Sequence, residues 1–365
     1  MTTVYTPADI RIERDMWETL AAADKPIVMY GMGNGADKIL AECERRGIEV
    51  RDFFASDGFV RHQLFHGKTV LSYTQICEKY GDFIVLVSFG TRLPEVLSNI
   101  YRIDAERELY MPDVPVVSES ALFDRGFFEA HRDALTAACD LFADELSRQT
   151  FCDVILYRLT GKIAYLRRHE VKPADAMALI GAEHFRETAD LGAYNGDSIR
   201  ELAEFAPDLT RVTAFEPDAR TFRKLTEWAA TAPYSVCAHH LAAWDREEEQ
   251  TFTAEGNRNS TLISRDGVKA GAKVKTVQAA RLDAVYEGHC DYIKYDVEGA
   301  EYEALCGSRE VVARCHPALL VSLYHRNEDL YRLPALVREM GYGKLYLRRY
   351  AYLPAWDLNL LAVWE

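Results

Sequence analysis

The sequence lacks the features that mark exported, zinc-binding and membrane-spanning proteins. Its eight cysteines are scattered over 365 residues, with no Cys-x-x-Cys pair and no histidine cluster that would complete a zinc site. No segment has the roughly 18 uninterrupted apolar residues that a membrane span requires. The first 20 residues carry charges every few positions and offer no apolar signal core. We therefore expect a cytoplasmic protein with reduced, mostly buried cysteines.

Basic residues are also fewer than acidic ones. The chain has 43 Lys and Arg against 57 Asp and Glu, a formal net charge of -14. This balance opposes non-specific attraction to phosphate backbones and to anionic lipid, so nucleic acid and membrane surfaces are poor candidates for a partner. Repeats and low-complexity tracts are absent too, whereas 48% of the residues are hydrophobic. A chain of this length and composition favours two globular domains.

Apolar runs and amphipathic stretches alternate over the first third of the chain. This alternation predicts a small parallel sheet with covering helices, a Rossmann-like domain within residues 1–117. The expected strands are 26–30, 48–54 and 83–89, and the expected helices follow each of them, ending near 46, 80 and 107. Between about 119 and 183 the strand signal disappears and apolar residues recur at helical spacing. Residues 118–184 are therefore predicted to be a helical connector.

The first of these strands ends in a glycine-rich turn that is a candidate ligand site. Gly31, Gly33 and Gly35 precede an amphipathic helix, and such a turn can bring a phosphate to the helix N-terminus. Asp57, near the end of the second strand, is a candidate ribose contact. A turn that only reverses the chain is an equally good interpretation of the three glycines.

From Glu187 the alternation resumes and continues to the end of the chain. The seven expected strands are 188–194, 211–217, 234–244, 290–297, 318–324, 343–350 and 357–364. Helical stretches are expected between the earlier strands, whereas a short loop around Leu353 and Pro354 joins the last two. Because parallel neighbours need a long crossover, this short loop forces an antiparallel hairpin. Residues 185–365 are therefore predicted to form a mainly parallel seven-stranded sheet with an antiparallel edge hairpin.

The first two strands of this unit carry a pattern typical of nucleotide binding. Glycines follow the first strand at a turn into a helix, and Glu216 ends the second strand 20 residues beyond Gly196. An acidic residue at that place can accept hydrogen bonds from both ribose hydroxyls. NAD would use the same geometry, so this pattern alone leaves the cofactor open. The predicted cofactor-binding residues are Asp190, Gly192, Ala193, Tyr194, Gly196, Glu216, Pro217 and Ala242.

Four short motifs together resemble the FkbM-type methyltransferase family over residues 185–350. They are Asp190-x-Gly-Ala-x-x-Gly196, Phe215-Glu-Pro-Asp218, Ile293-Lys-Tyr-Asp-Val-Glu-Gly-Ala-Glu301 and Ser322-Leu-Tyr-His325. Arg281-Leu-Asp283 stands where the family usually has Thr-Leu-Asp. The resemblance implies a class I Rossmann-like methyltransferase fold, S-adenosylmethionine as methyl donor, and a hydroxyl acceptor on a sugar, glycan, lipid or polyketide.

The N-terminal region resembles Rossmann-like modules that precede such methyltransferase domains. Related modules occur in nucleotide-sugar enzymes, so a nucleotide-linked acceptor at Gly31, Gly33 and Gly35 is an expectation from this resemblance. A homo-oligomer remains open. The polar segment 256–264 follows the third strand of the C-terminal unit, and a cap over the cofactor and a plain surface hairpin are equally good interpretations of it.

The candidate catalytic residues are Lys294, Asp296, Glu298 and His325. The first three alternate along a strand end, so their side chains can point to one face of the sheet. Asp296 or Glu298 could accept the acceptor's proton, and His325 could act as base at neutral pH. The alternative interpretations are structural: Lys294 and Asp296 form an ion pair, and His325 makes hydrogen bonds that only support the fold.

The clustered carboxylates at 296, 298 and 301 are also compatible with a divalent ion. Glu301, however, is expected to begin a helix, where a carboxylate interacts favourably with the helix dipole, and no metal ligand is assigned. Two other functions stay open at this stage: a nicotinamide-dependent oxidoreductase that uses one of the glycine turns, and a non-catalytic cofactor-binding protein.

Overall fold

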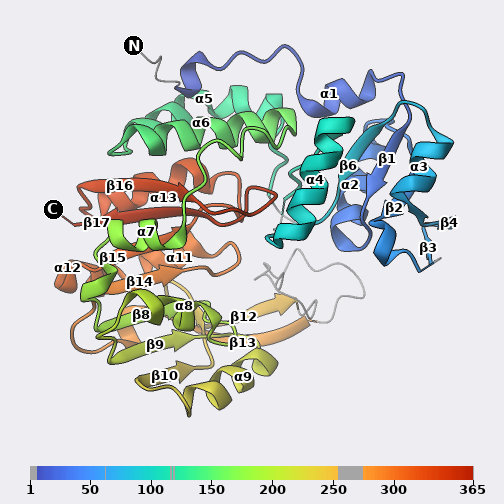
Figure 1. Cartoon of the computed structure of the whole chain (residues 1–365). Helices are drawn as coiled ribbons and strands as arrows, with labels where there is room; N and C mark the ends of the chain where they lie inside the picture. Colours follow the sequence, from blue (N-terminus) through green and yellow to red (C-terminus); the bar gives the residue numbers. More distant parts are fainter. Residues whose placement is uncertain (1–5, 62, 116, 118–119, 254–273, 365) are drawn as a thin grey trace.

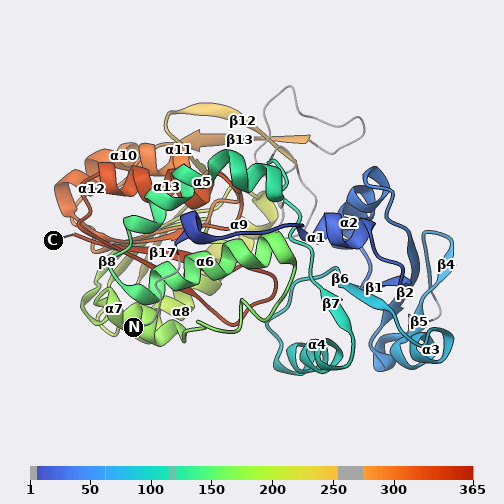
Figure 2. The same cartoon turned by 90° about the horizontal axis from the view of Figure 1, so that it is seen from above.

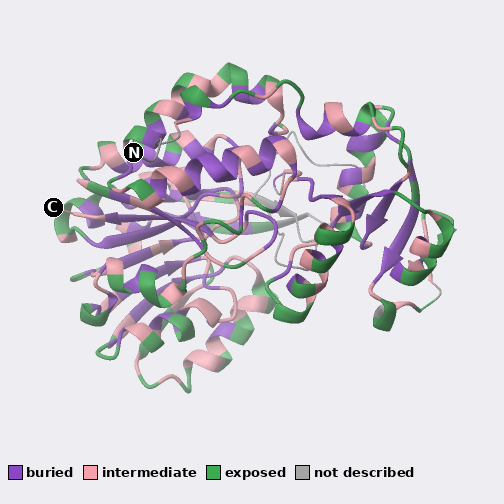
Figure 3. Ribbon diagram, turned by 45° about the horizontal axis from the view of Figure 1, so that its top comes forward, coloured by how far each residue is buried: buried purple, intermediate pink, exposed green. Residues whose placement is uncertain are grey.

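The protein consists of two α/β units that are joined by a pair of long helices (Figure 1). The computed structural model describes residues 6–61, 63–115, 117, 120–253 and 274–364. Seen from above, the N-terminal unit lies beside the larger C-terminal unit, and the connecting helices pack over the latter (Figure 2). Strands are buried in the centre of each unit, and the helices turn a buried face toward the sheets and an exposed face outward (Figure 3).

The N-terminal unit is a five-stranded parallel sheet in the order β5-β2-β1-β6-β7. Its strands are β1 (Ile27–Tyr30), β2 (Val50–Ala55), β5 (Leu71–Ser72), β6 (Ile84–Val87) and β7 (Glu108–Tyr110). One face packs against α1 (Met16–Ala21) and α2 (Asn34–Arg45), and the other against α3 (Tyr73–Lys79) and α4 (Pro94–Glu106). The predicted strands and helices are all present. The short strands β5 and β7 and the hairpin β3 (Leu64–Phe65) and β4 (Lys68–Thr69) were not predicted, because two or three residues carry no measurable periodicity.

The connector protects the edge of the C-terminal sheet. It contains α5 (Arg125–Asp140), α6 (Glu145–Thr160) and α7 (Pro173–Leu179). The backbone pairs with the edge strand β16 (Lys344–Arg349) at two isolated bridges, Phe142 with Leu345 and Glu170 with Arg349. Asp144, which caps α6, also forms an ion pair of 2.5 Å with Arg348. An edge strand that is covered in this way offers fewer free backbone groups to another chain.

The C-terminal unit is the predicted seven-stranded sheet. Its order is β10-β9-β8-β14-β15-β17-β16, and only β17 runs antiparallel to its neighbours. The strands are β8 (Glu187–Leu191), β9 (Arg211–Phe215), β10 (Ser235–His239), β14 (Tyr292–Tyr295), β15 (Ala318–Ser322), β16 and β17 (Leu358–Val363). The hairpin of β16 and β17 confirms the argument from the short connection. The mixed α/β fold with a mainly parallel sheet is therefore as predicted.

Alternation along the strands divides the buried residues of this sheet between two faces. On β14, Ile293 and Tyr295 pack with α11 (Glu301–Cys306), α12 (Arg309–Cys315) and α13 (Asp329–Glu339), whereas Tyr292 packs with α7, α8 (Asp197–Phe205) and α9 (Ala219–Ala229). Lys294 follows the period of two and therefore lies on the α8 side with Tyr292. Both faces are apolar because helices cover both.

The connection between the third and fourth of these strands differs from the prediction. Helical stretches were expected to separate the earlier strands, but this connection holds a small sheet in the order β11-β13-β12. Its strands are β11 (Ala242–Ala243), β12 (Glu248–Thr253) and β13 (Val274–Ala280), and a single helical turn, α10 (Leu282–Val285), follows. The sequence of β12, Glu-Glu-Gln-Thr-Phe-Thr, is mostly polar, so pairing with β13 and not burial defines it. The segment 256–264 lies outside the described residues.

Two further properties follow from the structure. All eight cysteines are free thiols; Cys43, Cys139, Cys152 and Cys290 are buried, and Cys237 is exposed. Among the described residues, no helix is both long and apolar enough to cross a membrane.

Candidate active site

A large cleft opens at the carboxyl ends of the central strands of the C-terminal sheet. Its volume is about 1390 Å³, more than one drug-sized ligand fills. Five of the eight predicted cofactor-binding residues line it: Gly192, Tyr194, Glu216, Pro217 and Ala242. So do all four candidate catalytic residues, Lys294, Asp296, Glu298 and His325. The cleft therefore brings together two groups of residues that lie about 100 positions apart in the chain.

The glycine turn after β8 has the shape that a bound ligand requires. Gly192 has φ +91°, and a Cβ there would overlap the carbonyl oxygen of Asp296. Gly196 has φ +83°, and a Cβ there would strike the ring of Trp228. Gly196 also precedes α8 and offers no capping side chain, although Asp197 Oδ1 accepts the N–H of Ser198 at 3.0 Å. The turn thus leaves helical N–H groups beside the cleft, where a carboxylate can be bound.

The three remaining predicted residues, Asp190, Ala193 and Gly196, do not line the cleft. Asp190 is buried; its Oδ2 accepts a hydrogen bond of 2.6 Å from the Ser198 hydroxyl, and burial raises its pKa. The Ala193 N–H donates to the carbonyl of Phe215 at 2.9 Å, which fixes the turn to the neighbouring strand β9. We infer that these residues shape the turn without facing the cleft.

Glu216 ends β9 as a buried carboxylate with spare hydrogen-bonding capacity. Its side chain lines the cleft, and its Oε1 accepts the N–H of Asp218 at 2.7 Å. Burial raises its pKa to about 7, although backbone hydrogen bonds from Asp218 and Tyr194 lower it. A carboxylate that is desolvated and only partly satisfied favours a ligand that brings further donors, such as a pair of ribose hydroxyls.

Lys294 holds two acidic side chains together on the α8 side of the sheet. Its Nζ lies 3.5 Å from Asp190 Oδ1 and 3.3 Å from Asp296 Oδ2. Burial disfavours the ammonium, but the two carboxylates outweigh it and raise the lysine pKa above its ordinary value. The ion pair suggested by the sequence is thus present, and it links the glycine turn to the catalytic candidates.

Asp296 is held ionised by hydroxyls as well as by Lys294. Burial raises its pKa, but Lys294, His325 and hydrogen bonds from Ser322 and Tyr324 lower it to about 2. Both hydroxyls donate to Oδ1 at 3.0 Å. Ser322 and Tyr324 belong to the motif Ser322-Leu-Tyr-His325, but no role was predicted for either side chain. Their alternation with Leu323 at a strand end was the signal that they share a face.

His325 lies at the centre of three carboxylates and is almost completely buried. Its Nδ1 lies 2.9 Å from Glu301 Oε1, and its Nε2 lies 3.5 Å from Glu298 Oε2 and 3.8 Å from Asp296 Oδ1. Burial lowers its pKa, but Glu301, Glu298 and Asp296 outweigh it and raise the pKa to about 10. At neutral pH the ring is therefore an imidazolium. A ring that already carries its proton does not fit the role of base suggested from the sequence.

Glu298 combines an unusual backbone with an unusual acidity. It has φ +55°, a left-handed conformation that is uncommon for residues other than glycine and that clusters at functional sites. Burial raises its pKa to about 8, an effect that Asp296 and Glu301 reinforce and that His325 and Lys294 oppose. About 32% of its side chain remains exposed, so the carboxyl can be reached from the cleft.

Among the residues that the structure describes, three members of this cluster have the spacing of metal ligands. Asp296, Glu301 and His325 each offer a ligand atom within 4.8 Å of the others. However, Glu301 Oε1 already accepts the N–H groups of Val297 at 2.9 Å and Gly299 at 3.4 Å, and Glu301 begins α11 as expected. With the Lys294 ammonium also beside Asp296, the contacts are those of an ion-pair network, and we assign no metal.

In the glycine turn of the N-terminal unit, Gly31 and Gly35 face other parts of the same unit, whereas a Cβ at Gly33 would meet nothing within 4 Å. A Cβ at Gly31 would lie 2.6 Å from the Ser88 hydroxyl and would meet the ring of Phe89; a Cβ at Gly35 would overlap the Ser88 carbonyl. These glycines therefore allow β1, α2 and the end of β6 to approach one another.

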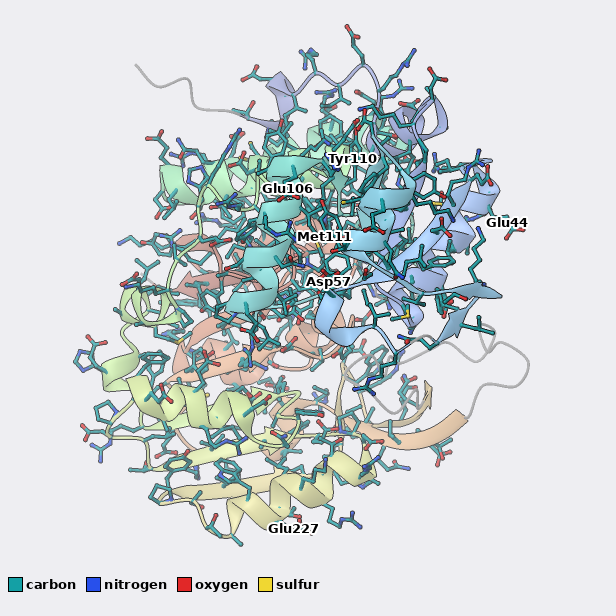
Figure 4. The ribbon with its side chains drawn as sticks, turned by 45° about the vertical axis from the view of Figure 1, so that its right-hand side comes forward. Glu44, Asp57, Glu106, Tyr110, Met111 and Glu227 are labelled. Atoms are coloured by element: carbon teal, nitrogen blue, oxygen red, sulfur yellow. The ribbon has the colours of Figure 1, made fainter. Side chains whose placement is uncertain are left out.

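Asp57, the candidate ribose contact of this turn, is hydrogen-bonded to the start of α3. Its Oδ1 accepts the N–H of Tyr73 at 2.9 Å, and its Oδ2 accepts the hydroxyl of Thr74 at 3.0 Å, so it caps α3 (labelled in Figure 4). The side chain that directly follows β2 is Ser56, which is hydrogen-bonded to Tyr30. The carboxyl edge of this sheet therefore has no counterpart of Glu216 among its described residues.

Comparisons with known proteins agree with this geometry. Residues 190–343 match the model of the Methyltransferase FkbM domain. The crystal structure of Methyltransferase FkbM from Methylobacillus flagellatus KT superposes with a TM-score of 0.70 at 18% sequence identity, over 93% of this chain and 90% of that one. The match therefore extends over the N-terminal unit and the connector as well.

Other solved structures match only part of the chain. A putative rRNA methylase from Clostridium thermocellum has a TM-score of 0.34 at 11% identity, over 53% of this chain and 96% of that one. An rRNA methylase from Streptococcus thermophilus has the same score at 12% identity, over 53% and 98%. No curated protein matches the chain. The family match and the fold together identify residues 190–343 of this chain as a methyltransferase domain of the FkbM family.

Proposed function

We propose that the protein transfers a methyl group from S-adenosylmethionine to a hydroxyl of an acceptor, with a sugar, glycan, lipid or polyketide as the acceptor class. One observation carries this proposal. The carboxylate of Glu216 and the glycine turn at Gly192 line the same cleft as the ion-pair network around Asp296. A nucleotide cofactor and a second molecule can therefore meet in one space of about 1390 Å³.

The residues present fit S-adenosylmethionine. Glu216 would accept the ribose hydroxyls, and the uncapped start of α8 after Gly196 would receive the carboxylate of the methionine part. When bound, the cofactor supplies an electrophilic methyl group on a sulfonium. The acidic side chains of Asp296 and Glu298 in the same cleft are complementary to that positive charge.

Glu298 is our candidate for the group that accepts the proton of the acceptor hydroxyl. A general base is most effective when its pKa is near the working pH, and a carboxyl of pKa about 8 meets this condition far better than one of pKa about 2. Asp296, fixed by Ser322, Tyr324 and Lys294, would orient the hydroxyl as an acceptor of its hydrogen bond. Positioning supplies much of the acceleration in this scheme.

His325 acts on this arrangement through charge. As an imidazolium between Glu301, Glu298 and Asp296, it partly compensates the three carboxylates that the fold brings together. Its replacement by a neutral residue would raise the pKa of Glu298 further, because the opposing charge is lost. His325 is therefore proposed as a positioning residue.

The proposal is tested by a methyl-transfer assay with labelled S-adenosylmethionine and a panel of hydroxyl-bearing acceptors. We expect label in at least one acceptor and inhibition by S-adenosylhomocysteine. Parallel titrations with NAD distinguish the nicotinamide-dependent alternative, since that enzyme would bind NAD and not S-adenosylhomocysteine. Binding of S-adenosylhomocysteine without transfer to any acceptor would instead favour a non-catalytic cofactor-binding protein.

A further inference from the structure

The loop after β6 contacts the C-terminal unit at the edge of the cleft. The Thr91 N–H donates to the carbonyl of Leu353 at 2.7 Å, and the Leu353 N–H donates to the carbonyl of Thr91 at 3.0 Å. Leu353 belongs to the loop between β16 and β17, whose side chains Tyr352 and Trp356 line the cleft. Two backbone hydrogen bonds thus join the carboxyl edge of the N-terminal sheet to the rim of the C-terminal one.

Gly90 shows how closely this joint is packed. A Cβ at this position would lie 2.5 Å from Trp356 Cζ3 and 3.1 Å from Tyr352 Cε1. The two aromatic rings lie 5.7 Å apart, at an interplanar angle of 37°. The backbone of the N-terminal unit therefore supports an aromatic wall of the cleft, and any larger residue at 90 would push the wall away.

Arg92 places a positive charge beside this wall. Its side chain is exposed and lines the cleft, although it belongs to the N-terminal unit. Among the residues that the structure describes, no carboxylate lies within ion-pair distance of its guanidinium. Its charge lowers the pKa of Glu201 on α8, which burial raises. The guanidinium therefore faces the cleft without being committed to a protein partner.

We propose that Arg92 binds an acidic group of the acceptor, a carboxylate or a phosphate, while a ring of the same acceptor packs on Tyr352 and Trp356. This inference rests on the proposed function and specifies that the methyl acceptor carries an anionic group. A guanidinium presents paired N–H donors that match either anion, and aromatic rings give a large contact area at small cost in side-chain entropy. The N-terminal unit then meets the acceptor at Arg92 and not at its glycine turn.

Matched ligand pairs test this proposal. Binding of glucose, glucuronate and glucose 6-phosphate to the protein loaded with S-adenosylhomocysteine is measured by nuclear magnetic resonance titration. We expect glucuronate or glucose 6-phosphate to bind at least tenfold more tightly than glucose, and the stronger of the two identifies the anion. Arg92→Gln should abolish this preference, whereas the exposed Arg61→Gln, outside the cleft in the same unit, should retain it. Equal binding of all three ligands to the wild type, or absence of binding, overturns the proposal.

Gly90→Leu provides a second, independent variant. Because its side chain would displace the aromatic wall, it should weaken the binding of all three ligands, while the preference for the anionic ligand that Arg92 confers should remain. S-adenosylhomocysteine affinity should stay within about threefold in both variants, since neither residue contacts the glycine turn. Loss of S-adenosylhomocysteine binding by the wild type would refute the proposed function itself, whereas its retention without anion preference would refute only this inference.

Discussion

The two sheets of this protein have the same local construction at their first strands and differ in what occupies the space above them. Each has a strand, a glycine turn and a helix, and each turn contains a glycine with positive φ. The missing Cβ of Gly192 makes room for the Asp296 carbonyl, and that of Gly31 for Phe89 and Ser88. Only Gly192 also lines a large cleft, together with Glu216. A glycine turn therefore shows only that another part of the chain approaches the backbone closely; the neighbouring cleft and Glu216 distinguish the C-terminal turn from the N-terminal one.

The strands next to these turns sharpen the contrast. In the C-terminal sheet, β14 continues into Asp296 and Glu298, which carry strongly shifted pKa values. In the N-terminal sheet, β6 continues into Ser88 and the loop that supports the aromatic wall. The carboxyl edge of the C-terminal sheet therefore carries the proposed catalytic residues, and the carboxyl edge of the N-terminal sheet contacts the rim of the same cleft.

The largest expected effect comes from Glu298→Gln. If Glu298 accepts the acceptor's proton, this change should lower kcat about 10²- to 10⁴-fold, the usual contribution of a general base. In the wild type, kcat/KM should rise about tenfold per pH unit well below pH 8, because the Glu298 carboxyl must lose its proton before it can act as a base. Glu298→Gln should remove this rise. Steady-state kinetics from pH 6 to 9 measure both. The exposed Glu310→Gln is the matched control, and a wild-type rate in Glu298→Gln would remove this residue from the chemistry.

Glu216→Ala should have the next largest effect. Loss of charged hydrogen bonds to the ribose costs about 1.5–3 kcal/mol each, so the affinity for S-adenosylhomocysteine should fall by roughly 10- to 150-fold. Calorimetry measures it, with Glu227→Ala on the outer side of α9 as control (Figure 4). Unchanged affinity would mean that the ribose lies elsewhere.

The ionisation of Glu216 should appear in the pH dependence of binding. Its pKa of about 7 in the free protein means that the carboxylate must lose a proton before it accepts ribose hydroxyls. Affinity for S-adenosylhomocysteine should therefore rise about fivefold from pH 6 to 7 and about twofold more by pH 8, where it begins to level off. The same carboxyl stabilises the free protein below its unfolded pKa of 4.5, and this contribution is lost as the pH rises through about 7. A flat affinity profile in the wild type, equal to that of Glu216→Gln, would contradict this assignment.

Asp57→Ala, the corresponding change in the N-terminal unit, should have the smallest effect. It removes two hydrogen bonds at the start of α3, so the free energy of unfolding should fall by about 1 kcal/mol, as for a lost helix cap. Affinity for S-adenosylhomocysteine should not change. Denaturant unfolding and calorimetry measure the two quantities. Weaker nucleotide binding without loss of stability would restore Asp57 as a ribose contact.

The sequence predicted the central strands because burial on two faces leaves long apolar runs, and it predicted the edge hairpin because the loop at Leu353 and Pro354 is short. It did not predict β12 and β13, whose pairing involves polar residues. The site was predicted where function depends on backbone shape and spacing, as at Gly192 and Glu216. It could not show that Glu301 would keep His325 protonated, or that Arg92 would reach the cleft, because both depend on contacts between distant segments.

The central claim is that the cleft of the C-terminal sheet binds the methyl donor through Glu216 while the N-terminal glycine turn does not. Isothermal titration of the full chain with S-adenosylhomocysteine tests it most directly, with wild type, Glu216→Ala and Asp57→Ala measured side by side. The account predicts one binding site per chain, weakened at least tenfold in Glu216→Ala and unchanged in Asp57→Ala. No heat of binding in the wild type, or a loss of affinity in Asp57→Ala alone, would contradict it.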